Sequence, residues 1–124
     1  PQPKLRGYPP ETVIAEKLQA MIFLGMSNSR MKDFYDLWIL AQTHASPKTT
    51  LAEAIRETFA RRGTELPQEM PLVFTDEFVN AKQKMWGAYR DKANLLDAPA
   101  EIEEIVTRLR EWLMPVISLA RKKK

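Results

Sequence analysis

Three charged side chains in two neighbouring stretches could carry chemistry. Lys17 lies within ETVIAEKLQAMIFLGM, where apolar residues recur at the three- and four-residue spacing of a helix. Asp33 and Asp36 lie in RMKDFYDLW and, three residues apart, share a helix face with Leu37 and Leu40. A lysine in apolar surroundings either extends to water or meets an anion, and half-buried carboxylates need a cation or a metal. The lysine and the aspartates are therefore predicted to meet.

A short turn should bring the two stretches together. GMSNS, residues 25–29, is rich in residues that break helices, so the flanking helices are predicted to form a hairpin. Antiparallel packing around residue 27 puts Lys17 level with about position 37, nearest Asp36, with Asp33 one turn closer to the loop. Arg30 and Lys32 add positive charge at the loop end. Lys17 and Arg30 could hold a triphosphate while Asp36 positions a hydroxyl group.

The same spacing has a purely structural interpretation. Buried lysine–aspartate pairs occur in helical bundles without any catalytic role, and a salt-bridge network could simply lock the hairpin. Spacing alone favours this structural interpretation over a site that performs chemistry.

The elements that must position these residues are predicted to be helices. Helical spacing of apolar residues recurs along the chain, and no alternating pattern longer than a few residues is present. We expect an all-α fold of about five helices in a bundle-like packing. The predicted organisation is an extended proline-rich segment over residues 1–10, a helical domain over 11–120 and a basic tail over 121–124.

Capping residues and prolines predict the helix ends. The expected starts are Glu11 or Thr12 for the first helix, Ser29 for the second, Thr49 or Thr50 for the third, Thr75 for the fourth, and Asp97 with Pro99 in the first turn for the fifth. Pro115 should end or kink the fifth helix. In the fourth helix the candidate core residues are Phe78, Val79, Met85, Trp86 and Tyr89.

Composition excludes several classes of protein. The 124 residues include no cysteine and one histidine, His44, which rules out disulfides, thiol catalysis and a His-rich metal site. No apolar run approaches the roughly 18 residues of a membrane span, so we expect a soluble, cytoplasmic protein without membrane contact. The formal net charge is +3, but Arg121 to Lys124 supply four positive charges; without them the chain carries −1. The body of the chain is therefore not a basic nucleic-acid domain.

The two motifs together resemble a known family. ETVIAEKL followed by NSRMKDFYDLW is similar to the two downstream motifs of the AbiEii/AbiGii-type nucleotidyltransferase toxins, which belong to bacterial toxin–antitoxin and abortive-infection systems. AIRETFARRGTELP and KMWGAYRDK also resemble the C-terminal half of that family. The resemblance implies an enzyme that transfers a nucleoside monophosphate from a nucleotide triphosphate to an acceptor, tRNA in some members. It also implies a divalent metal, Mg²⁺, and a cognate antitoxin as partner.

The resemblance gives each motif residue an expected role. Lys17 matches the family's phosphate-contacting lysine, and Arg30 and Lys32 match the basic positions of the last motif. Asp33 and Asp36 match its two aspartates, one of which is expected to be catalytic; the hairpin register favours Asp36.

One part of the family's pattern is not found. Its upstream half carries a Gly/Ser-rich motif and a D-x-D pair that holds the metal, and nothing in residues 1–124 matches them. The chain begins at Pro1, and its first methionine is Met21. We therefore expect the helical C-terminal part of such an enzyme, with no metal ligands of its own and no activity alone.

Two other functions are compatible with the sequence. A non-catalytic helical module could bind an antitoxin or another protein through the fourth and fifth helices. A nucleic-acid binder would depend on the basic tail alone, Arg121 to Lys124.

Overall fold

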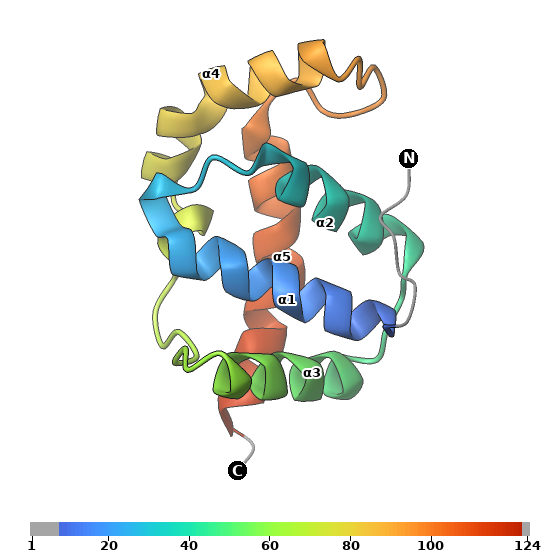
Figure 1. The fold of residues 1–124 in the computed structure, drawn as a ribbon, viewed down its shortest axis with the longest axis vertical. Coiled ribbons are helices and arrows are strands. Elements are labelled where there is room, and N and C mark those ends of the chain that lie inside the picture. Colours follow the sequence, from blue (N-terminus) through green and yellow to red (C-terminus); the bar gives the residue numbers. More distant parts are fainter. Residues whose placement is uncertain (1–7, 123–124) are drawn as a thin grey trace.

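Helices make up the framework of the chain (Figure 1). The computed structural model describes residues 8–122, which contain five α-helices, two short 3₁₀ helices and no strand. The predicted all-α fold with five helices is confirmed. In chain order the elements are α1 (Pro10–Leu24), η1 (Gly25–Ser27), α2 (Met31–Thr43), α3 (Lys48–Arg61), η2 (Leu72–Phe74), α4 (Asp76–Lys92) and α5 (Ile102–Lys122).

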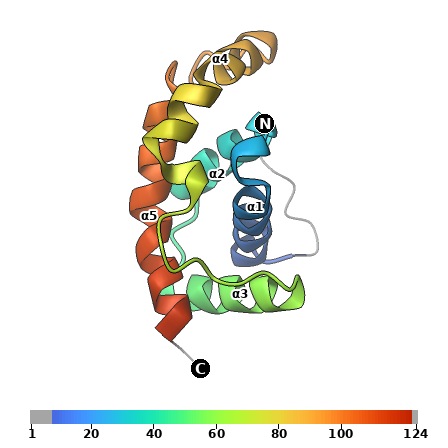
Figure 2. The same ribbon diagram turned by 90° about the vertical axis from the view of Figure 1, so that its left-hand side faces the viewer.

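The long helix α5 supports α2, α3 and α4. It runs along one side of the molecule, and α1, α2 and α3 lie across it, with α4 at one end (Figures 1 and 2). The most extensive packing joins α1 to α3 and α3 to α5, while α2 packs on α5 and also contacts α1. Consequently α3 holds α1 in place and α5 holds α2, so the two helices that carry the candidate residues are each fixed by another helix.

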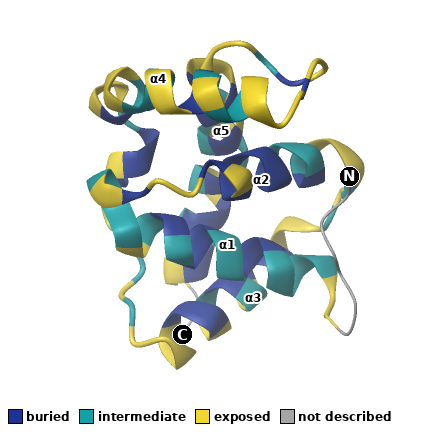
Figure 3. Cartoon of the chain, turned by 45° about the horizontal axis from the view of Figure 1, so that its top comes forward, coloured by how far each residue is buried: buried dark blue, intermediate teal, exposed yellow. Residues whose placement is uncertain are grey.

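The core is formed by the inward faces of all five helices (Figure 3). Its aromatic residues link helices that are distant in sequence: the rings of Phe34 in α2 and Phe78 in α4 stack with centroids 5.5 Å apart. Trp86 is fully buried and donates its indole N–H to the Pro99 carbonyl over 3.0 Å. Each such buried side chain stabilises the fold by about 2 kcal/mol relative to an exposed one.

The predicted core of α4 is only partly correct. Phe78 and Trp86 are buried, and Val79 and Tyr89 are half-buried against the core. Met85 is exposed, so its assignment to the core is wrong. In α4 the two fully buried positions are eight residues apart, which leaves a narrower apolar stripe than the sequence suggested.

Of two predicted capping residues, Thr75 is confirmed and Ser29 is wrong. Thr75 caps α4 as expected, because its hydroxyl accepts a hydrogen bond from the Phe78 N–H over 3.3 Å. Ser29 does not cap α2, which begins at Met31. Instead the buried side chain of Asn28 accepts a hydrogen bond from the Arg30 N–H over 2.7 Å and fixes the turn that leads into the helix.

Prolines set the starts of α1 and α3. Each helix begins directly after a proline in extended conformation, Pro9 or Pro47. The fixed φ of Pro10 also suits the first position of α1, so this helix starts just before the predicted residues. Thr49 and Thr50 lie inside the first turn of α3, and their prediction as caps is wrong.

The start of α5 differs from the prediction, and of the two effects expected of Pro115, an end or a kink, the structure excludes the end. The helix begins at Ile102 rather than Asp97, because side chains of α4 bind the preceding backbone. Gln83 accepts from the Ile102 N–H over 2.7 Å and donates to the Ala100 carbonyl over 3.2 Å. Pro115 does not end the helix, which continues to Lys122. Pro115 is exposed, so water can bond the carbonyl that this proline leaves free.

The two predicted terminal segments fall partly outside the described residues. Of the segment 1–10, residues 1–7 lie outside, and Pro10 already belongs to α1. Of the tail 121–124, Lys123 and Lys124 lie outside. Arg121 and Lys122 are the last residues of α5, and Arg121 donates to the Pro67 carbonyl over 3.3 Å.

Candidate functional site

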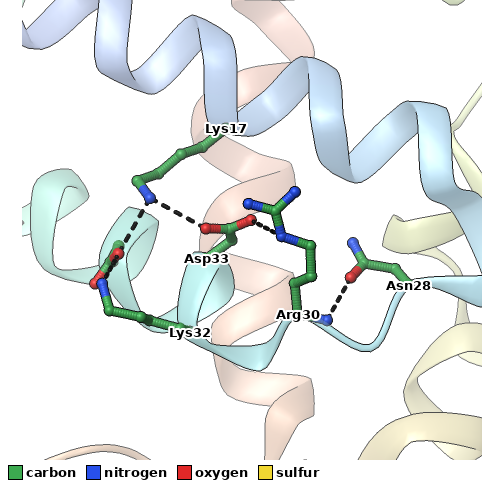
Figure 4. A network of polar contacts seen from close by, with 6 residues as sticks. Lys17, Asn28, Arg30, Lys32 and Asp33 are labelled. Atoms are coloured by element: carbon green, nitrogen blue, oxygen red, sulfur yellow. Dashed lines mark hydrogen bonds and ion pairs between the residues drawn. The ribbon is translucent and has the colours of Figure 1, made fainter.

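Lys17 lies between the two aspartates of α2. Its Nζ is 3.1 Å from Asp33 Oδ1, to which it donates a hydrogen bond, and 3.1 Å from Asp36 Oδ2. Figure 4 shows the amine extending from α1 toward Asp33. The hairpin register predicted Asp36 as the nearer carboxylate, but the lysine contacts both equally, because residues three apart on a helix present their side chains to the same partner.

Two further cations complete what we call the ion cluster, formed by Lys17, Arg30, Lys32, Asp33 and Asp36. Arg30 Nε lies 3.1 Å from Asp33 Oδ2, and Lys32 Nζ donates to Asp36 Oδ2 over 2.7 Å. The side chains of Arg30 and Lys32 are 59% and 68% exposed, whereas those of Asp33 and Asp36 are 7% and 2% exposed. All five predicted residues are therefore brought together, with carboxylates inside and cations at the rim.

The ion cluster changes the titration of the groups around it. The pKa of Lys32 is raised, chiefly because its amine donates a hydrogen bond to Asp36. The pKa of Tyr89 in α4 is raised by burial and then by the nearby charge of Asp36, since both disfavour the phenolate. Lys32 therefore keeps its positive charge, and Tyr89 its proton, throughout the neutral range.

The two carboxylates differ in their hydrogen bonding. Asp36 Oδ2 accepts a hydrogen bond from Lys32. Asp33 Oδ2 is buried and, within the described residues, accepts no hydrogen bond; Arg30 Nε is close to it, but only the charges interact. A buried carboxylate oxygen with a free lone pair can accept a further proton donor.

An open cavity of about 760 Å³ lies over part of the ion cluster. Lys17, Arg30 and Asp33 line it, whereas Asp36 and Lys32 do not. The cavity thus gives a ligand access to one amine, one guanidinium and one carboxylate.

The cavity also has three charged residues that sequence reasoning missed. Glu16 Oε2 accepts from Arg61 over 2.6 Å, and Glu16 Oε1 from Arg62 over 2.8 Å; all three residues line the cavity. The adjacent arginines before Gly63 were visible in AIRETFARRGTELP. No spacing rule connects position 16 with positions 61 and 62, because the contact depends on how α1 packs on α3.

The described residues do not form a metal site. Among residues 8–122 no three His, Cys, Asp or Glu side chains come close enough to hold a metal ion. The carboxylates of Asp33 and Asp36 have the Lys17 amine between them. The residues present therefore do not fit the Mg²⁺ that the resemblance implies.

Nor does any helix in the part that the structure describes have the length and apolar character needed to cross a membrane.

Comparison with known proteins identifies the family. Neither the curated proteins nor the solved structures gave a match to this chain. A family model described as nucleotidyl transferase AbiEii toxin, type IV toxin–antitoxin system, matches residues 1–108. That span includes both motifs and all five residues of the ion cluster, and it covers most of the sequence. The chain belongs to the AbiEii nucleotidyltransferase toxin family.

Proposed function

We propose that this chain supplies the phosphate-binding lysine and an acidic catalytic residue of a nucleotidyltransferase toxin. The reaction moves a nucleoside monophosphate from a nucleotide triphosphate to an acceptor such as tRNA. The observation that carries the proposal is the position of Lys17, whose amine meets two buried carboxylates beneath an open cavity. Membership of the AbiEii family supports the reaction class.

Lys17 and Arg30 are proposed to bind the triphosphate. Both line the cavity, and Lys17 is held in place by Asp33 and Asp36. A cation held in this way needs no reorganisation when negative charge builds up on the transferred phosphate. Lys32 is outside the cavity and is proposed to fix Asp36 rather than to touch the nucleotide.

Asp33 is proposed to accept the proton of the acceptor hydroxyl. The hydroxyl oxygen forms a bond to the α-phosphorus, the bond from that phosphorus to the bridging oxygen breaks, and diphosphate leaves. The proton passes to the carboxylate of Asp33, which lines the cavity and whose Oδ2 accepts no hydrogen bond within residues 8–122. Asp36, which the hairpin register favoured, is proposed to position Lys17 instead, because it lies outside the cavity.

The metal, the antitoxin and the cellular setting are proposed from membership of the family. Bound Mg²⁺ would neutralise charge on the triphosphate, and the described residues do not fit it, so its ligands are proposed to lie outside them. The proposed roles of Lys17, Arg30 and Asp33 do not depend on the metal. We also propose a cognate antitoxin and a bacterial cytoplasmic setting; the family's description as a type IV toxin–antitoxin system supports the antitoxin.

Transfer of labelled nucleotide to tRNA by the full-length protein tests these roles. We expect Lys17→Ala to reduce kcat/KM by at least about 100-fold, the scale of losing one oriented electrostatic group. Asp33→Asn should lower kcat, whereas Asp36→Asn should mainly raise KM for the nucleotide, because it only loosens Lys17. Arg108→Gln, which removes an exposed arginine of α5, is the control and should leave transfer unchanged.

Two measurements decide between catalysis and structure. Thermal unfolding followed by circular dichroism shows whether each variant is folded at the assay temperature. If folded Lys17→Ala protein labels tRNA as well as the wild type, the ion cluster is a structural lock and the proposed roles are wrong. The chain would then be better described as a non-catalytic helical module.

A further inference from the structure

A second cavity, next to the one over the ion cluster, is lined by three arginines and an exposed aromatic ring. It measures about 590 Å³, and we call it the arginine trough. Its lining is Gln19, Ala20, Phe23, Leu24, Arg30, Arg61 and Arg62. The trough and the cavity share all three arginines, so they form one continuous surface that leads to Lys17.

The trough concentrates positive charge in a chain that is otherwise nearly balanced. Its lining includes three arginines and no acidic residue, whereas the chain has 19 basic and 16 acidic residues. The three arginine side chains are all more than half exposed. Since planar guanidinium groups bind phosphate through paired N–H donors, this surface suits a chain of phosphates.

Acidic side chains hold the arginines in position and use only some of their N–H donors. Glu16 is shared between Arg61 and Arg62, and Asp33 lies beside the Nε of Arg30. A guanidinium has five N–H donors, so each arginine retains several for a ligand. Preorganised cations lose less conformational entropy when an anion binds than freely moving ones would.

Phe23 adds a different kind of contact. Its side chain on α1 is 73% exposed, although it borders the three arginines. A single exposed aromatic residue is ordinary, but a phenyl ring beside three cations offers a base a surface for stacking next to its phosphates. Unstacked bases are available in single strands and not in duplexes.

We propose that the arginine trough binds the single-stranded end of the nucleic-acid acceptor, with one base on Phe23 and phosphates on Arg61 and Arg62. This inference rests on the proposed function, because it assigns the acceptor to a surface that leads to Lys17. An acidic protein segment would use the same charges, but it would gain little from stacking on Phe23.

Binding of a fluorescent RNA to the full-length protein, followed by anisotropy, tests the trough directly. The probe is an unstructured single strand of about ten nucleotides, within the length that one site covers, and a duplex of the same length is its comparison. Phe23→Ala should weaken single-strand binding about tenfold and leave duplex binding unchanged, since stacking is lost only for free bases. Leu96→Ala, at an equally exposed apolar position, is the matched control and should change neither.

The arginines are tested by their effect on salt dependence. Arg61→Gln combined with Arg62→Gln should weaken binding and reduce the slope of log K against log salt by about 1.4, the value for two phosphate contacts on a single strand. Arg108→Gln is the control for loss of an exposed arginine elsewhere. An unchanged slope overturns the proposal.

Three other results would also overturn it. The first is equal behaviour of Phe23→Ala and Leu96→Ala. The second is equal weakening of single-strand and duplex binding by Phe23→Ala. The third is competition by polyglutamate at the same charge concentration as RNA, which would identify a surface for an acidic protein.

Lys17→Ala separates this inference from the proposed function. It should abolish nucleotide transfer while the single-stranded RNA still binds, because Lys17 does not line the trough. In the transfer assay, Phe23→Ala should raise KM for the acceptor and not for the nucleotide. If Lys17→Ala transfers nucleotide normally, the proposed function fails, whereas loss of RNA binding in the trough variants still supports the trough.

Discussion

Among the three cations of the ion cluster, Lys17 is the least exposed, and it stabilises the buried carboxylates most. The Lys17 side chain is 20% exposed and serves both Asp33 and Asp36, whereas Arg30 and Lys32 each serve one from the rim. Screening by water weakens the rim pairs far more than the inner ones. Lys17 is therefore expected to contribute to folding as well as to the proposed chemistry.

Replacing Lys17 with methionine should destabilise the protein by about 3 kcal/mol, the lower end of the range for breaking a buried ion pair, because the rim cations still serve the aspartates. Lys32→Met, the matched change at the rim, should cost at most about 1 kcal/mol. Urea unfolding of both variants measures the difference. Equal losses of unfolding free energy in the two variants would show that the burial of a cation does not determine its contribution to stability.

The raised pKa of Lys32 predicts a dependence of stability on pH. A folded-state pKa above the ordinary value of 10.5 means that the stabilisation is complete below that value and is lost as pH rises through the folded-state pKa. The difference in unfolding free energy between wild type and Lys32→Met should thus be constant from neutral pH to about pH 9 and should fall in stronger alkali. Urea unfolding of both proteins across this range measures it. A difference that grows with pH would contradict the assignment.

Residue types and spacing were enough to predict the ion cluster but not all of the site. Lys17, Asp33 and Asp36 stand out because charge interrupts apolar helical faces, and one short turn brings them together. The pairing of Glu16 with Arg61 and Arg62 spans 45 and 46 residues and depends on helix packing. Local patterns contain no information about such a contact.

Some helices start where the local sequence alone determines it, and others start where a neighbouring helix determines it. Thr75 caps α4 by itself, whereas α5 starts only where Gln83 of α4 binds the Ile102 N–H. Capping preferences therefore predicted the first start correctly and the second too early, at Asp97. The start of α5 required knowledge of the packing between α4 and α5.

Thr75→Ala should lower the unfolding free energy by about 1 kcal/mol, because the Phe78 N–H loses its cap. Thr49→Ala should change it by less than about 0.5 kcal/mol, since Thr49 is exposed inside the first turn of α3 and caps nothing. Thermal or urea unfolding of the two variants distinguishes them. A larger effect at Thr49 would contradict the observed start of α3.

At the scale of the whole molecule, stability depends on α5, which α2, α3 and α4 all contact. Its apolar residues recur at helical spacing, and eight of them have relative exposures of 1% or less: Ile102, Ile105, Val106, Leu109, Leu113, Val116, Ile117 and Ala120. Its amphipathic character could be predicted from periodicity, whereas its continuation through Pro115 could not, because a proline inside a helix usually ends or kinks it. The order in which other helices pack on it could not, because several helices present similar apolar faces.

Leu109→Ala should destabilise the protein by about 3 kcal/mol, since the side chain is fully buried and leaves a cavity. Leu96→Ala removes the same group from an exposed position and should cost less than about 0.5 kcal/mol. Chemical unfolding measures both values. Similar losses for the two leucines would mean that α5 is not the centre of the core.

The location of Arg61 and Arg62, at the C-terminal end of α3, has a consequence for how such a site can change. Lys17, Asp33 and Asp36 belong to one continuous stretch, Pro10 to Thr43, whereas Arg61 is the last residue of a later helix and Arg62 follows it. Under the proposed function, substitutions of these exposed arginines should change which acceptor binds without removing the amine or either aspartate. A protein built on this plan is therefore expected to change its acceptor while the proposed chemistry stays the same.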